Sequence, residues 1–384
     1  MRARQTALQY TAMRIAPFGV EMWMNECETR CSHNLAETCV ASLTVGELLS
    51  LAAQPAEAFD AMRQLPLTYG AIEGSEALRG AIARLYRAVT PAQVLVAHGA
   101  IGANGLAYQA LVEPGDVVVS VQPTYQQHYS IPESLGAEVR ILRLRPEQAF
   151  QPDLDALAGL IDARTRLVVL NNPNNPTGAL MPEPTLRAVA ALADRVGAWV
   201  LCDEVYRGLD QHDPGTTASM ADVYPKGIST GSMSKAFSLA GLRLGWMAGP
   251  AEMLHAAMIH RDYNTISVGV VDDYLATIAL MQADTVLARS RAITRRNLAL
   301  VRSWMATQPQ LSWVEPESGT TALLRLPEGE DSYAFCRQLL AETGVLLTPG
   351  QAMAMEGWVR MGYANHTDVL TAGLERLGAF LHTR

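Results

Sequence analysis

Only two lysines occur in this chain, and their surroundings differ. Lys226 lies between Pro225 and Gly227, a sequence typical of an exposed turn. Lys235 lies among small residues and hydroxyls, with an apolar, glycine-punctuated run behind it. An amine in such surroundings loses hydration, so we expect its pKa to fall. A neutral amine can attack a carbonyl carbon and form a Schiff base, which makes Lys235 the candidate nucleophile.

Two residues near Lys235 are suited to hold a phosphate group. Ser232 lies three residues before it, and Arg243 lies eight residues after it. A hydroxyl and a fixed cation beside a reactive lysine suit a phosphate monoester on an aldehyde cofactor, and pyridoxal phosphate fits that description. Residues 99–101 form a second candidate anion site, because a predicted strand gives way there to a helix with free N–H groups. By itself such a glycine-rich turn is also ordinary packing.

Polar residues follow two further predicted strands. Residues 171–178 contain four asparagines, among them Asn175, and two prolines, a density that favours a ligand site over a plain turn. Asp203 ends the next strand, where a buried carboxylate is costly unless it is paired. A protonated pyridine nitrogen would be such a partner; the alternative is that Asp203 caps a helix. Tyr206 could reach the ring hydroxyl and Tyr125 could stack on the ring, although an aromatic residue there is also typical of a core.

Arg360 alternates with apolar neighbours on another predicted strand. A buried guanidinium needs a partner, and its planar fork suits a carboxylate that accepts two hydrogen bonds. The α-carboxylate of an amino acid would fit, so Arg360 is a candidate for substrate binding. A structural salt bridge is the alternative.

The candidate residues must be held in place by regular secondary structure, and residues 94–202 predict alternating strands and helices. Short β-branched runs alternate with helical stretches. Strands that are apolar throughout indicate an α/β fold with a mostly parallel sheet covered by helices on both faces. Ligands of such sheets bind at the carboxyl ends of the strands. Gly99, Tyr125, Asn175 and Asp203 each follow a predicted strand, so we expect them at one edge of the sheet.

Chain length and hydrophobic content predict two domains. We expect a large cofactor-binding domain over residues 46–283 and a smaller domain over residues 284–384. The N-terminal segment, residues 1–45, should be irregular and should pack with the smaller domain. Thr44, with Glu47 three residues later, predicts a capping box at the start of a helix.

Composition excludes several classes of partner. The formal net charge is −8 and no lysine-rich run occurs, which argues against nucleic acid and anionic membranes. The five cysteines contain no CxxC pair and indicate free thiols, and Cys27 with Cys31 lacks a second half-site, so we expect no metal. No signal-like pattern or membrane-length apolar run occurs. We therefore expect a cytoplasmic protein that acts on a small molecule.

Together these motifs resemble one family, the class I/II aminotransferases, which are pyridoxal phosphate enzymes of fold type I. The resemblance runs in unbroken order from about residue 35 to the end of the chain. The segments that carry it are Tyr69 with Gly74, Leu78-Arg79, Gly99-Ala100, Pro123-Thr124-Tyr125, Asn175-Pro176-Thr177-Gly178, Asp203-Glu204-Val205-Tyr206, Ser232 through Arg243, Pro349-Gly350 and Arg360. The resemblance implies an aspartate aminotransferase-like fold, with a mostly parallel sheet flanked by helices and a smaller α+β domain.

The resemblance also implies a role for each candidate residue. Lys235 would be the Schiff-base lysine and proton shuttle, and Arg360 would bind the substrate α-carboxylate. The residues implied to hold pyridoxal 5'-phosphate are Gly99, Ala100, Ile101, Tyr125, Asn175, Asp203, Tyr206, Ser232, Lys235 and Arg243. Tyr69 would reach the phosphate of the neighbouring subunit, which implies a homodimer with shared active sites.

The sequence departs from the family near Thr38, where members commonly have a glycine-containing turn over the substrate. Thr38 and Asn175 are therefore candidate substrate contacts alongside Arg360. Residues 21–24 and 39–42, with Arg261-Asp262-Tyr263, resemble the capreomycidine synthases, family members that act on a hydroxylated arginine.

We predict transamination of an L-amino acid with a 2-oxo acid as acceptor, beginning with loss of the α-proton to Lys235. The alternative is elimination and cyclisation of a β-hydroxylated arginine, because the β-hydroxyl can leave and a guanidine nitrogen of the same molecule can close a ring. The carboxylates that could hold the guanidinium are Glu21, Glu26, Glu37 and Asp262, although a solvated surface charge is the more typical interpretation of each.

Overall fold

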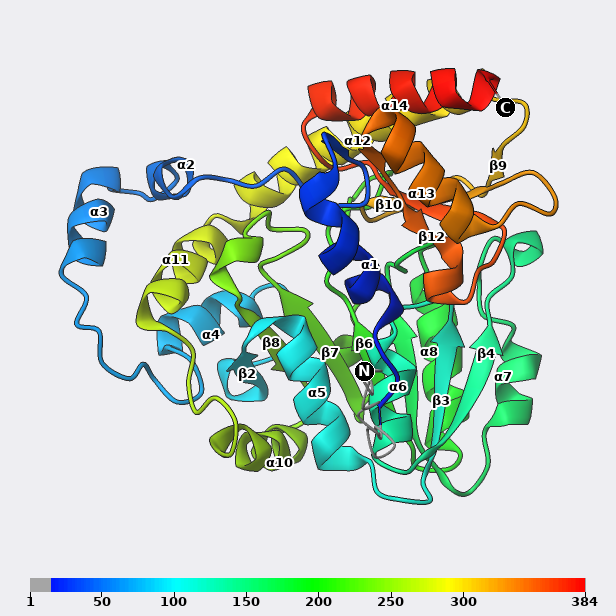
Figure 1. The fold of residues 1–384 in the computed structure, drawn as a ribbon. Helices are drawn as coiled ribbons and strands as arrows, with labels where there is room; N and C mark the ends of the chain where they lie inside the picture. The colour runs from blue at the N-terminus through cyan, green and yellow to red at the C-terminus, as the bar shows by residue number, and fades with distance from the viewer. Residues whose placement is uncertain (1–14, 384) are drawn as a thin grey trace, which may run out of the picture.

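The computed structural model describes residues 15–383 and contains a central seven-stranded sheet (Figure 1). In spatial order its strands are β2 (Val94–Ala97), β8 (Gly245–Ala248), β7 (Gly227–Ser232), β6 (Trp199–Asp203), β5 (Thr165–Asn171), β3 (Val117–Gln122) and β4 (Glu138–Arg143). All neighbours run parallel except β8, which is antiparallel to both β2 and β7. The predicted α/β fold with a mostly parallel sheet is confirmed.

Helices cover both faces of this sheet because successive strand residues point in opposite directions. In β3, Val117, Val119 and Val121 belong to one buried cluster with Leu186, whereas Val118 belongs to the cluster on the other face. The helices that follow the strands are α5 (Gly99–Leu111), α6 (Gln127–Ser134), α7 (Leu154–Leu160), α8 (Glu183–Asp194), α9 (Met220–Val223) and α10 (Ala251–Asp262). Alternating strands and helices place the carboxyl ends of the parallel strands at one edge, where ligands bind.

A second, antiparallel sheet is formed by the C-terminal part of the chain. Its strands are β12 (Thr348–Pro349), β13 (Trp358–Gly362), β10 (Thr321–Arg325) and β9 (Ser312–Trp313), in spatial order. The helices of this part are α12 (Ala283–Met305), α13 (Ser332–Thr343) and α14 (Thr367–His382), which lie together at the top of Figure 1. Their apolar residues share one buried cluster with β10 and β13.

The N-terminal segment contains a helix, α1 (Gly19–Cys27), so the expectation that this segment is irregular is wrong. Its buried residues Val20, Trp23 and Cys27 recur at helical spacing, a pattern present in the sequence. The indole Nε1 of Trp23 donates to the carbonyl of Leu347 at 2.8 Å. Farther along, β1 (His33–Asn34) pairs in parallel with β11 (Val345–Leu346). Residues 1–14 lie outside the described residues.

The remaining elements are α2 (Val45–Ser50), α3 (Pro55–Arg63), α4 (Glu76–Ala83), α11 (Val270–Met281) and the 3₁₀ turns η1 (Glu28–Arg30), η2 (Pro91–Gln93), η3 (Pro146–Gln148), η4 (Ala240–Leu242) and η5 (Gly350–Met353). The predicted capping box of Thr44 and Glu47 is present at the start of α2. Figure 1 shows α2 and α3 extending to one side of the body. Among residues 15–383, no helix has the length and apolarity needed to cross a membrane.

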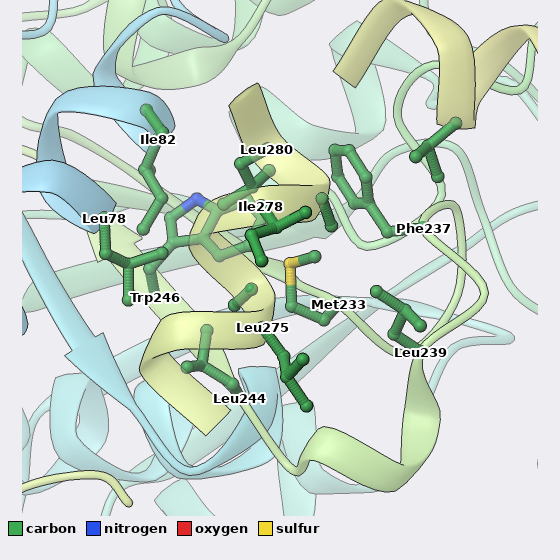
Figure 2. Packing of buried hydrophobic residues seen from close by; sticks show 14 of the residues in the cluster. Leu78, Ile82, Met233, Phe237, Leu239, Leu244, Trp246, Leu275, Ile278 and Leu280 are labelled. Carbon is green, nitrogen blue, oxygen red and sulfur yellow. The ribbon is translucent and has the colours of Figure 1, made fainter. Parts of the chain in front are cut away.

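The stretch around Lys235 rests on a buried apolar cluster (Figure 2). Met233 and Phe237 of this stretch pack in that cluster with Trp246 of β8, and Leu78 of α4 lies in the same cluster. Phe237 and Trp246 meet edge to face with ring centroids 6.2 Å apart. Tight packing of this kind restricts the backbone on both sides of the lysine. The cluster therefore fixes the position from which Lys235 projects.

Candidate active site

A cavity of about 410 Å³ lies where the strand ends of the large sheet meet α1 and the segment after β1. Apart from the candidate guanidinium-binding carboxylates, it brings together all but one of the predicted site residues. Those that line it are Thr38, Gly99, Ala100, Ile101, Tyr125, Asn175, Asp203, Tyr206, Ser232, Lys235, Arg243 and Arg360. Tyr69 is the exception, because its side chain is 77% exposed and does not line the cavity of its own chain.

Two groups of lining residues come from different parts of the chain. The cofactor floor is the group from the start of α5, the end of β6 and the stretch around Lys235, namely Gly99, Ala100, Ile101, Asn104, Asp203, Ser232, Ser234, Lys235 and Arg243. The N-terminal wall consists of lining residues that precede α2, namely Val20, Glu21, Met24, Glu28, Ala36, Glu37, Thr38 and Cys39.

One end of the cofactor floor is built to hold an anion. Helix α5 begins at Gly99, and the N–H groups of its first turn have no partner within the helix. Gly99, Ala100 and Ile101 of this turn line the cavity. A Cβ added at Gly245 would collide with the backbone of Gly99 and Ala100, so glycine is required for this close approach. Ser232 and Arg243 line the same region. Helix N–H groups, a hydroxyl and a guanidinium match the oxygens of a phosphate monoester.

Asp203, at the end of β6, is 5% exposed and is supported from behind by buried polar residues. The amide Nδ2 of Asn104 donates to Asp203 Oδ2 at 2.9 Å, and Thr230 in turn donates to Asn104 Oδ1 at 2.7 Å. His128 Nε2 lies 3.5 Å from Asp203 Oδ2, and the other ring nitrogen of His128 lies 2.8 Å from the Tyr108 hydroxyl. This network orients the carboxylate toward the cavity, where it can hold a pyridine nitrogen in its protonated form. Sequence reasoning missed His128 and Tyr108, since neither belongs to a recognisable motif.

Lys235 projects from the floor toward the N-terminal wall. Its Nζ donates to Thr38 Oγ1 at 2.6 Å and lies 3.5 Å from Cys39 Sγ. Burial alone would lower the pKa of the Lys235 amine, but the facing Cys39, Tyr206 and Glu37 outweigh burial and hold the pKa above its ordinary value. The predicted fall in pKa is therefore wrong for the free amine. Glu37 and Cys39 of the wall and Tyr206 after β6 are partners that the sequence pattern does not reveal.

Arg360 is 4% exposed and forms a second fixed cation in the cavity. Its guanidinium donates to Asn175 Oδ1 at 3.3 Å, to the carbonyl of Ala36 at 3.1 Å and to Thr348 Oγ1 at 3.1 Å. No carboxylate of the described residues forms an ion pair with it, and its Nε has no hydrogen-bond partner. The alternative of a structural salt bridge is wrong, and the guanidinium is held by neutral groups in a position to bind a carboxylate ligand.

Tyr125 links the sheet edge to helix α1. Its ring lies 4.7 Å from that of Phe18, and its hydroxyl donates to Glu21 at 3.1 Å. Burial raises the pKa of the Tyr125 hydroxyl, and the neighbouring Glu21 raises it further, so the phenol stays protonated. An aromatic face at the cavity is compatible with stacking on a flat ring.

The predicted guanidinium-binding carboxylates divide into two groups. Glu21 and Glu37 line the cavity, and Glu28, which the sequence reasoning did not name, joins them. Glu26 instead pairs with Arg337 at 2.8 Å on the surface, and Asp262 is not a lining residue. The helical spacing of α1 is the signal that separates Glu26 from Glu21, because residues five apart on a helix point in different directions.

The model of the aminotransferase class I and II family matches residues 40–376. The chain belongs to the class I and II aminotransferases. It is therefore a pyridoxal phosphate-dependent enzyme of fold type I, and the floor residues fit that cofactor: an anion site, a buried carboxylate and an amine lie around one cavity.

Individual members of this family match along nearly the whole chain. The capreomycidine synthase of Streptomyces vinaceus is 32% identical over 374 residues, which cover 97% of this chain and 95% of that protein. The structure of a PLP-dependent aminotransferase from Streptococcus suis 89-1591 superposes with a TM-score of 0.93 and 40% identity, covering 97% of this chain and 99% of that one. The PLP-dependent cyclase OrfR superposes with a TM-score of 0.90 and 29% identity, covering 98% and 100%.

Proposed function

We propose that this protein is an aminotransferase that moves the α-amino group of an L-amino acid to a 2-oxo acid. The observation that carries the proposal is the convergence of Lys235, Asp203 and Arg360 on one cavity. This reaction needs three groups from the protein: the amine of Lys235, the carboxylate of Asp203 for a ring nitrogen, and the guanidinium of Arg360 for a substrate carboxylate.

Each of these residues has a distinct task in the proposed reaction. Bound pyridoxal phosphate supplies a ring that draws electrons away from the substrate Cα. Asp203 keeps the pyridine nitrogen protonated, and Arg360 holds the substrate carboxylate so that the Cα–H bond faces Lys235. The Lys235 amine would then remove the α-proton and, in transamination, deliver it to the cofactor carbon. This is general acid–base catalysis by a positioned group. Ser232, Arg243 and the N–H groups of α5 hold the phosphate.

A second candidate is elimination and cyclisation of a β-hydroxylated arginine. Two observations favour it: the likeness to a capreomycidine synthase and a cyclase over almost the full chain, and the Thr38 hydroxyl 2.6 Å from Lys235 Nζ. A hydroxyl at that place could pass a proton from Lys235 to a leaving group on Cβ. Transamination stays first, because Thr38 alone does not supply the ring-closing step.

Product analysis by mass separates the two candidates. The purified holoenzyme is given one amino acid at a time without a 2-oxo acid, with L-arginine and β-hydroxyarginine in the panel. Transamination stops after one turnover with the cofactor left as its amine, and addition of a 2-oxo acid restores turnover. Cyclisation gives many turnovers with β-hydroxyarginine and a product lighter by one water, which would replace transamination as the function.

We also propose that the protein acts as a homodimer whose sites include Tyr69 of the neighbouring subunit. Leu67 is 86% exposed and Tyr69 is 77% exposed, both in the connection that follows α3. Exposed apolar side chains clustered on one segment are typical of an interface. Light scattering of the purified protein measures its mass in solution, and a monomer with full activity would contradict the proposal.

A further inference from the structure

We infer that the substrate carries a positive charge at the end of an aliphatic side chain, and that Glu21, Glu28 and Glu37 of the N-terminal wall bind this charge. The inference rests on the proposed function, since it identifies the substrate class of the same cavity. It covers transamination and cyclisation alike, because both begin with binding of the intact amino acid.

The three carboxylates come from different places in the chain. Glu21 lies on α1, Glu28 lies in η1, and Glu37 lies in the loop after β1, yet all three line one cavity. No ion pair within residues 15–383 involves any of them, whereas Glu26 of the same segment is paired with Arg337. The cations that face these carboxylates lie outside the wall: Lys235 faces Glu37, and Arg360 faces Glu37 and Glu21.

Charge balance in the loaded cavity argues for a cationic side chain. The lining cations within the described residues are Lys235, Arg243 and Arg360. Arg243 faces the phosphate end, Arg360 is available for the α-carboxylate, and Asp203 is matched by a ring nitrogen. Arg360 also faces Glu37 and Glu21, but a bound α-carboxylate would occupy its guanidinium, which leaves Lys235, beside Glu37, as the remaining cation for the wall. Glu21 and Glu28 are exposed and screened by solvent, whereas Glu37 is half-buried, so a cationic side chain would gain most from Glu37 and an acidic side chain would be repelled by it.

Arg360 gives an independent sign that a ligand belongs here. It is buried, lines the cavity and keeps Nε without a partner. A buried guanidinium with unused donors is costly unless a ligand completes it. An α-carboxylate bound by Arg360 would fix one end of the amino acid in the cavity. The substrate side chain would then extend along the other lining residues.

Glu37 is the member of the wall best prepared to bind a cation. The N–H groups of Thr38 and Cys39 both donate to Glu37 Oε1, at 2.7 and 2.8 Å. Burial alone would raise the pKa of Glu37, but Lys235 and these hydrogen bonds outweigh burial and lower it, so the group is ionised at neutral pH. The apolar side chains of Val20 and Met24 line the same wall and can cover the methylene stem of a long side chain.

The test compares two substrates that differ in charge but hardly in shape, L-arginine and L-citrulline. We expect kcat/KM for cofactor conversion to favour arginine by about 10- to 100-fold, the loss expected when a charge-assisted hydrogen bond is removed. Glu37→Gln and Glu28→Gln should each reduce this preference, and Glu37→Gln keeps the carbonyl that accepts the two N–H groups. Glu26→Gln is the matched control and should leave it unchanged.

A binding measurement separates this inference from the proposed function. Deamino-arginine, which lacks the reacting amine, should bind the holoenzyme more tightly than deamino-citrulline in a calorimetric titration, and added salt should weaken the difference. If no amino acid reacts but deamino-arginine still binds preferentially, the proposed function fails and the inference stands. Equal use and equal binding of the charged and neutral analogues would overturn the inference, as would an equal effect of Glu26→Gln and Glu37→Gln.

Discussion

The two parts of the cavity are built in different ways. The cofactor floor comes from the ends of strands and the start of α5, elements locked by buried clusters on both faces of the sheet. The N-terminal wall comes from the short helix α1, the 3₁₀ turn η1 and the loop that follows β1. Strand β1 pairs with β11, which connects this segment to the C-terminal part of the chain. We propose that the floor holds groups for chemistry common to the family, whereas the wall holds carboxylates suited to one kind of substrate. Substitutions in the two parts should therefore have separable effects.

The largest effect is expected at the centre of the floor. Lys235→Ala should reduce turnover by about 10²- to 10⁴-fold, because proton transfer by a positioned group contributes a factor of that size. The protein should also lose the visible absorption of lysine-bound cofactor. Lys226→Ala is the matched control, since Lys226 donates to the carbonyl of Gly197 on the surface, and it should keep full activity. Comparable losses in both variants would show that the floor is wrongly assigned.

A smaller loss of activity is expected when Asp203 is replaced. Asp203→Asn should retain cofactor but lower kcat by about 100-fold, a barrier increase of ~2.7 kcal/mol, because the neutral amide no longer stabilises a protonated ring nitrogen. Steady-state kinetics and cofactor content measure the two quantities separately. Activity close to that of the wild type would reduce Asp203 to a structural residue.

Arg360→Ala should act on the substrate and leave the cofactor in place. Truncating one partner of a buried charge pair costs about 2–5 kcal/mol, so the apparent affinity for amino acids should fall accordingly. Spectral titration of the holoenzyme with amino acids gives this affinity. An unchanged affinity would mean that the α-carboxylate binds elsewhere. The proposal that the wall carboxylates bind the substrate side chain would then lose its support, because it assumes that Arg360 holds the α-carboxylate.

The smallest effect concerns Cys39 on the wall. Burial raises the pKa of its thiol to about 11, although the nearby Lys235 lowers it. Because the thiolate is the nucleophile, alkylation of Cys39 should be slow at neutral pH and accelerate as the pH approaches that value. Glu37 raises this pKa, so Glu37→Gln should make alkylation faster. Peptide mass mapping with iodoacetamide measures the rate, and rapid labelling of Cys39 at neutral pH would contradict the geometry of the wall.

The location of several floor residues at the sheet edge could be predicted because they lie next to strong local signals. Asp203 follows an apolar strand, and the glycine at position 99 marks a strand-to-helix turn. Strands β7 and β8 were not predicted, since glycine, serine and threonine weaken the strand pattern there. The strands nevertheless lie on both sides of the predicted Lys235 stretch, so the missed elements did not alter the site.

The wall was predicted less well, for a physical reason. Its residues meet the floor through contacts distant in sequence, such as Thr38 with Lys235 and Arg360 with the carbonyl of Ala36. No local period or motif encodes such contacts. Helix α1 was missed although its apolar spacing was visible, and the raised pKa of Lys235 follows from neighbours that only the fold brings near.

The most direct test of the account is to find which lysine carries the cofactor. The protein isolated with its pyridoxal phosphate is reduced with borohydride, digested and mapped by mass. Because the chain has only two lysines, the answer is unambiguous between them. The account predicts the reduced cofactor on the peptide that contains Lys235. A reduced cofactor on the peptide that contains Lys226 would contradict it.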